Sequence, residues 1–67
     1  MTKKELKIEI EKEIKTLFDN HMINEANYLY GKNLEGRYYI HSKATKQQLE
    51  NLYVDIVNFK SDNRISD

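Results

Sequence analysis

Two matching motifs, one near each end of the chain, constrain the fold more than any other feature of the sequence. Thr2 is followed three positions later by Glu5, and Thr45 is followed three positions later by Gln48. This pattern is typical of the capping box, in which two side chains accept hydrogen bonds from backbone N–H groups left unpaired at a helix start. Because the chain also contains no proline, the motifs predict an uninterrupted helix at each end.

Apolar residues at helical spacing follow both motifs. After Thr2 they form one stripe, made of Leu6, Ile10, Ile14, Leu17 and Phe18. After Thr45 they form a broader stripe, made of Leu49, Leu52, Tyr53, Ile56, Val57 and Phe59, which Val54 widens further. We predict helices over about 3–20 and 45–60. The second stripe is wider than contact with one neighbouring helix requires.

The middle of the chain has two interpretations. Asn24 can cap a helix over 24–34, with Glu25 in its positive first turn and Gly36 after its end. Alternatively, residues 27–30 form a strand that pairs with residues 37–41 in a hairpin. Both interpretations predict an extended conformation for residues 37–41. We therefore predict a mainly α, small three-helix domain with a short extended segment near 37–41; the alternative is an α+β fold, α–β–β–α with a central hairpin.

The length of the chain limits its stability. Residues 1–67 make a single small domain, in which the polar residues 61–67 are expected to fray apart from an anchor at Ile65. A single core of this size seldom supplies more than about 3–5 kcal/mol. The chain has no cysteine, so neither disulfides nor a thiolate metal site can add to that. Self-association or a partner protein is the remaining source of stability.

The charges are balanced, with eleven basic and eleven acidic side chains spread evenly along the chain. This disfavours a dedicated nucleic-acid binder, although a neutral total does not exclude a basic face in three dimensions. No apolar run is long enough to span a membrane, and the first residues lack an apolar signal core. We therefore expect a soluble, cytoplasmic protein with no membrane partner. Abundant Lys, Asn, Ile and Tyr favour an origin in a phage or mobile element of a low-GC bacterium.

No set of residues in the sequence predicts catalysis. His21 is expected to be a boundary residue whose ring packs at the end of the first helix, where its charge suits the negative helix end. His41 lies beside Ser42, but a nucleophile and its base need a third, orienting group that the sequence does not supply. We predict that the protein is not an enzyme and that it holds no cofactor and no metal.

Four tyrosines lie close together in the sequence: Tyr28, Tyr30, Tyr38 and Tyr39. Tyrosine joins a large ring to a polar tip, which suits ordinary packing and also protein interfaces. The residues that we predict for a protein interface are Tyr30, Tyr38, Tyr39, Val54 and Val57. Aromatic rings beside basic residues also suit nucleic acid. In that alternative the phosphate contacts come from Lys32, Arg37, Lys43 and Lys46.

These features predict a non-enzymatic interaction module that regulates or inhibits a host or cognate protein. Its partner would be another protein, including a second copy of itself, because nothing else in so short a chain covers the excess apolar surface. The alternative function is a small DNA- or RNA-binding regulator.

Overall fold

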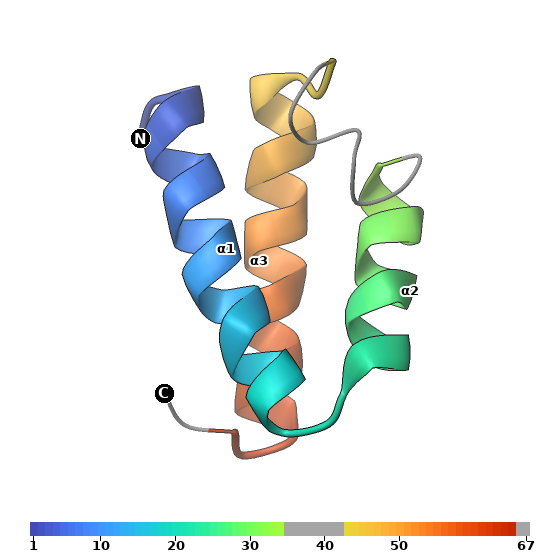
Figure 1. Ribbon diagram of the computed structural model, residues 1–67. Coiled ribbons are helices and arrows are strands. Elements are labelled where there is room, and N and C mark those ends of the chain that lie inside the picture. The colour runs from blue at the N-terminus through green and yellow to red at the C-terminus, as the bar shows by residue number, and fades with distance from the viewer. Residues whose placement is uncertain (35–42, 66–67) are drawn as a thin grey trace.

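The computed structural model describes residues 1–34 and 43–65, which form three packed helices. Helix α1 spans Lys3–Asp19, α2 spans Ile23–Asn33 and α3 spans Lys46–Asp62. Helices α1 and α3 run in the same direction and α2 runs against them (Figure 1). As a result, α1 and α3 begin at the same end of the bundle.

The prediction of a mainly α, three-helix domain is confirmed. The described residues contain no strand, and residues 27–30 lie inside α2. The alternative hairpin is therefore wrong. The extended segment predicted near 37–41 lies outside the described residues.

Both predicted capping boxes are present. At the start of α1, the Thr2 N–H donates to Glu5 Oε1 at 2.9 Å and the Glu5 N–H donates to Thr2 Oγ1 at 3.2 Å. At the start of α3, the Thr45 N–H donates to Gln48 Oε1 at 2.8 Å and the Gln48 N–H donates to Thr45 Oγ1 at 3.1 Å. These local bonds fix where both helices begin, as the sequence predicts.

The predicted cap of α2 is wrong. The N-cap residue is Met22, which makes no side-chain capping bond, and Asn24 already lies inside the helix. The first backbone bond of the helix runs from the Ala26 N–H to the Met22 carbonyl at 3.0 Å. Since Met22 packs against the core, tertiary contact rather than a cap side chain sets this boundary.

Helices α1 and α3 also end in the same way. After α1, the Met22 N–H donates to the Leu17 carbonyl at 2.9 Å and the His21 N–H donates to the Phe18 carbonyl at 3.0 Å. This bond pair is the Schellman motif, and His21 takes the left-handed conformation it requires, with φ 61°.

The end of α3 repeats the motif. The Ile65 N–H donates to the Lys60 carbonyl at 2.9 Å, and the Arg64 N–H donates to the Ser61 carbonyl at 3.2 Å. Arg64 has φ 56°, and Ile65 packs against the core. The turn therefore directs the chain back onto the bundle after α3 ends.

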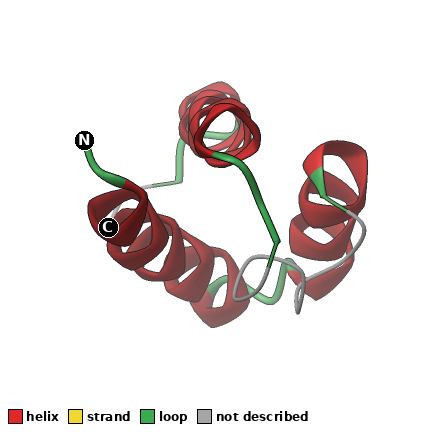
Figure 2. Cartoon of the chain, turned by 90° about the horizontal axis from the view of Figure 1, so that it is seen from above, coloured by secondary structure: helices red, strands yellow, loops and turns green. Residues whose placement is uncertain are grey.

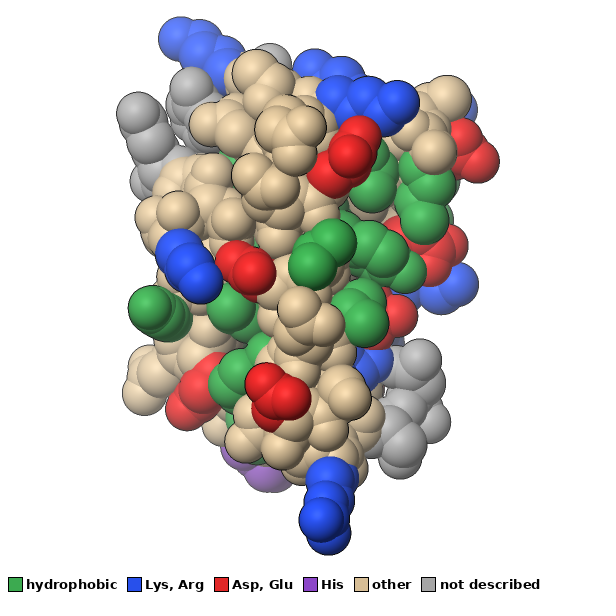
Figure 3. Space-filling model, turned by 180° about the vertical axis from the view of Figure 1, so that it is seen from behind, with side chains coloured by type: hydrophobic (Ala, Val, Ile, Leu, Met, Phe, Trp, Pro, Cys, Tyr) green, Lys and Arg blue, Asp and Glu red, His purple; other side chains and the backbone are tan. Residues whose placement is uncertain are grey.

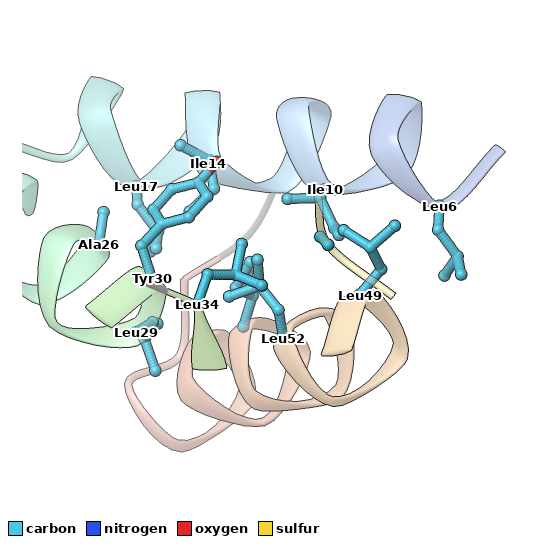
Figure 4. Close-up of a cluster of buried hydrophobic side chains, with 12 residues drawn as sticks. Leu6, Ile10, Ile14, Leu17, Ala26, Leu29, Tyr30, Leu34, Leu49 and Leu52 are labelled. Atoms are coloured by element: carbon cyan, nitrogen blue, oxygen red, sulfur yellow. The ribbon is translucent and has the colours of Figure 1, made fainter. Parts of the chain in front are cut away.

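The core lies between the three helices, each of which contacts the other two (Figure 2). The described residues supply twelve buried apolar side chains to it, namely Leu6, Ile10, Ile14, Leu17, Ala26, Leu29, Tyr30, Leu34, Ala44, Leu49, Leu52 and Ile56. Figure 4 shows Tyr30 pointing from α2 toward α1, into the interior shared by the three helices. Burying an aliphatic or aromatic side chain of this kind stabilises the fold by about 1.5–3 kcal/mol.

Within residues 1–34 and 43–65, one charged side chain joins this apolar interior. Lys60 is 6% exposed, and its Nζ donates to Glu13 Oε2 on α1. Buried charges are tolerated when they are paired, and this pair links the end of α3 to the middle of α1.

Candidate functional site

The strongest candidate for a functional surface is the side of α3 that faces away from the bundle. Five exposed residues form it, and we call them the outer face of α3: Asn51, Val54, Val57, Asn58 and Ser61. Val54 is 52% exposed and Val57 is 39% exposed. Tyr53 is half-buried beside them. In Figure 3, which views the molecule from behind, hydrophobic atoms gather over this part of α3.

The outer face of α3 carries no charged side chain. Within residues 51–61 the two charged side chains are both held by other helices. Asp55 is half-buried and accepts from Asn33 Nδ2 at 2.9 Å, with Lys32 Nζ at 3.5 Å. Lys60 is buried against Glu13. The exposed residues on this stretch are therefore apolar or neutral polar, the composition typical of the centre of an interface.

The outer face of α3 also has the spacing of a helix–helix contact. Asn51, Val54, Asn58 and Ser61 are separated by three, four and three residues, which places them on one stripe of the helix. The sequence pattern predicts only the two valines of this face, because apolar spacing does not mark neutral polar residues. The absence of charge at this spacing is the signal that would have found the rest.

A hollow in the surface lies between α2 and α3. It has a volume of about 300 Å³ and is lined by Asn24, Glu25, Tyr28, Leu29 and Phe59. Tyr28 is 62% exposed at its edge. The hollow is shallow and carries one carboxylate, so it lacks the converging polar groups that characterise a small-molecule site.

The structure divides the residues predicted for a protein interface. Val54 and Val57 lie exposed on the outer face of α3. Tyr30 is 4% exposed and belongs to the core, because its ring turns inward from α2. The Tyr30 ring is therefore not available on the surface of one copy of the protein. Tyr38 and Tyr39 lie outside the described residues.

The residues predicted for phosphate contacts are also divided. Lys32 forms an ion pair with Asp55 and is thereby drawn to the side of α3. Lys43 and Lys46 are exposed at the start of α3 and make no ion pair with a described residue. Arg37 lies outside the described residues. The structure therefore places Lys43 and Lys46 at one end of the bundle and Lys32 at the side of α3.

The expected packing of His21 is wrong. Its side chain is exposed, because α1 ends at Asp19 and the left-handed turn at residue 21 takes the chain off the apolar stripe. His41 lies outside the described residues. Among the residues that are described, no three His, Asp or Glu side chains come together as a metal site.

No family model, curated protein or solved structure matches this chain. None of the three described helices is long and apolar enough to cross a membrane.

Proposed function

We propose that this protein is a small interaction module that self-associates by pairing the outer face of α3 with the same face of a second copy. The observation that carries the proposal is the charge-free stretch of exposed residues between Asn51 and Ser61, with Val54 and Val57 at its middle. Exposed valines on a surface without charge lose unfavourable contact with water when a like surface covers them.

A second copy can cover this face because the same patch on both copies can pair about a two-fold axis. In a two-fold pair, each copy presents the same patch, so Val54 and Val57 would oppose the same two residues of the other copy. Within residues 51–61 this face brings no exposed charges together; its borders carry Glu50, one turn before Val54, and Asp62, one turn after Asn58. The chain also has no net charge, a condition that promotes association.

The size of the patch sets the expected strength. Full burial of a valine is worth about 1.5–3 kcal/mol, and Val54 and Val57 are already about half covered, so the four valines of a pair supply about 3–6 kcal/mol. Association costs about 4–15 kcal/mol in lost motion. The gain matches only the lower end of this cost, so we expect a weak, concentration-dependent dimer.

Sedimentation analysis over a wide range of protein concentration tests the proposal. The native chain should shift from monomer toward dimer as its concentration rises. The double variant Val54→Glu with Val57→Glu should remain monomeric, because it places charges at the centre of the proposed contact. Both positions are already exposed, so far-ultraviolet circular dichroism should show unchanged helix content.

The matched control is Ile8→Glu. Ile8 is 50% exposed on α1, close to the 52% of Val54, so Ile8→Glu matches the single variant Val54→Glu, which adds the same one charge and should weaken association. The Ile8→Glu variant should associate like the native chain. Monomeric behaviour of the native chain at all concentrations would overturn the proposal. Equal loss of association in the control and in Val54→Glu would show that added charge, and not this face, is responsible.

A role as regulator or inhibitor of a host or cognate protein, an origin in a phage or mobile element, and the lack of enzymatic activity stay predictions from the sequence. Self-association through α3 is compatible with such a role, since most soluble oligomers are symmetric assemblies of one kind of chain.

A further inference from the structure

Eight of the nine lysines of this protein fall into two groups that the balanced charge total conceals, and the half-buried Lys7 of α1 belongs to neither. Four make ion pairs: Lys12 with Glu9, Lys15 with Asp19, Lys32 with Asp55, and Lys60 with Glu13. All four pairs lie along the sides or in the interior of the bundle. In these pairs each positive charge already has a negative partner.

A second group lies at the end of the bundle where α1 and α3 both begin. We call it the basic end, and it consists of Lys3, Lys4, Lys43 and Lys46. All four are exposed, and none makes an ion pair within residues 1–34 and 43–65. Figure 3 shows basic side chains along this upper end of the molecule.

The parallel course of α1 and α3 brings these lysines together. Residues 3–4 and 43–46 are forty positions apart in the sequence, yet Figure 1 places the starts of both helices at the same end. Each helix start also carries a partial positive charge, which adds to that of the lysines. The arrangement therefore concentrates positive potential at one end of a neutral molecule.

Few carboxylates oppose this charge. The first turn of α3 contains no acidic residue, and the first turn of α1 contains only Glu5. The Glu5 carboxylate is engaged by the Thr2 N–H at 2.9 Å. Among residues 1–34 and 43–65, two carboxylates lie near the four exposed lysines. Glu5 is turned to its own backbone, and Glu50 is half-buried one turn after Lys46 in α3.

We propose that the basic end binds the phosphate backbone of nucleic acid. Exposed lysines and helix N-termini are the groups that most often contact phosphates in such complexes. An acidic membrane surface fits less well, because stable membrane attachment also needs a broad apolar face beside the charge. The inference is independent of the proposed self-association, because the basic end and the outer face of α3 share no residue.

Fluorescence anisotropy with a short, fluorescein-labelled DNA duplex of mixed sequence tests the inference. Binding should appear at low salt and weaken as salt rises. Each lysine that contacts a phosphate contributes about 0.9 to the slope of log affinity against log salt, so four contacts predict a roughly 100-fold loss between about 50 and 200 mM salt.

Two double variants locate the contact. Lys43→Gln with Lys46→Gln should lower the salt slope by about 1.8. Lys12→Gln with Lys15→Gln removes the same charge from the side of α1 and should leave the slope unchanged. Glutamine and lysine have similar helix propensities, and circular dichroism confirms equal helix content before the comparison.

Three outcomes would overturn the inference. The first is no binding of the native chain at low salt. The second is an equal reduction of the slope in both double variants, which would indicate attraction without a located site. The third is tight binding to vesicles containing phosphatidylserine together with no binding to DNA, which would assign the basic end to a membrane surface instead.

Discussion

Lys60 of α3 and Glu13 of α1 form an ion pair inside the bundle. Their side chains are 7% and 15% exposed, and Lys60 Nζ donates to Glu13 Oε2. Lys60 follows Ile56 by four residues, so it lies on the stripe of α3 that forms the core. The removal of both charges from water costs several kcal/mol per ion, and their mutual attraction offsets that cost. The pair therefore contributes little net stability, but neither partner can be removed alone without a large cost.

We expect Glu13→Leu to destabilise the fold by about 3–5 kcal/mol, because it removes the Glu13 carboxylate from beside the buried Lys60 ammonium. The double variant Glu13→Leu with Lys60→Met should recover most of this loss or exceed the native stability, since two apolar side chains of similar volume replace the pair. Urea unfolding followed by circular dichroism gives the free energies.

The control for this prediction is Lys15→Met. Lys15 and Asp19 form an exposed pair on α1, with side chains 78% and 64% exposed. Exposed pairs contribute at most about 1 kcal/mol. A cost for Glu13→Leu no larger than that of Lys15→Met would contradict the burial of the pair.

Two tyrosines on α2 should respond very differently to truncation. Tyr30 is 4% exposed in the core, whereas Tyr28 is 62% exposed. Tyr30→Ala should cost about 3–5 kcal/mol, in the range of buried aromatic residues. Tyr28→Ala should change stability by no more than about 0.5 kcal/mol. Thermal or urea unfolding of both variants measures the difference, and similar costs would contradict the placement of the two rings.

The sequence predicts the first and last helices, α1 and α3, well because their boundaries are set locally. Thr2 and Thr45 find their hydrogen-bond partners three residues away, so the pattern alone specifies the bond. The start of α2 has no such bond, and its position depends on Met22 packing against the core. A rule based on cap residues therefore selects Asn24, two positions too late.

Other features depend on contacts between distant segments and cannot be read from spacing alone. The interior position of Lys60 requires Glu13 to lie opposite it, forty-seven residues earlier in the chain. The side on which α2 meets the core decides that Tyr30 is buried and Tyr28 exposed. The sequence predicts only part of the outer face of α3, because its neutral polar residues stand out only where Asp55 and Lys60 are held by other helices.

The capping box of α1 should make its first turn sensitive to acid. The hydrogen bond from the Thr2 backbone lowers the pKa of Glu5 below its ordinary value. A lowered pKa in the folded state means that the stabilisation is present above the ordinary pKa and is lost as the pH falls through the folded value. We expect the NMR shift of the Thr2 amide proton to follow the titration of Glu5 in this acid range.

Glu5→Gln provides the control for the acid response. Gln48 occupies the corresponding position in α3 and makes the same bond without titrating. The variant should retain the first turn of α1 and show no change in the Thr2 amide between neutral and acidic pH. A Glu5 pKa at or above the ordinary value of a glutamate would contradict the capping bond.

Replacing His21 with glycine should stabilise the protein. His21 occupies the position after α1 where the Schellman motif requires a left-handed conformation, and its φ is 61°. This conformation costs a residue with a side chain about 1–2 kcal/mol, whereas the greater freedom of glycine in the unfolded chain costs about 0.5–1 kcal/mol. The balance favours His21→Gly by about 0.5–1 kcal/mol, measured by urea unfolding.

Arg64→Gly, at the same position after α3, should gain a similar amount, and Asn20→Gly should lose stability because the φ of Asn20 is −98°. A loss of stability in His21→Gly would show that the exposed imidazole makes a contact that outweighs the backbone strain.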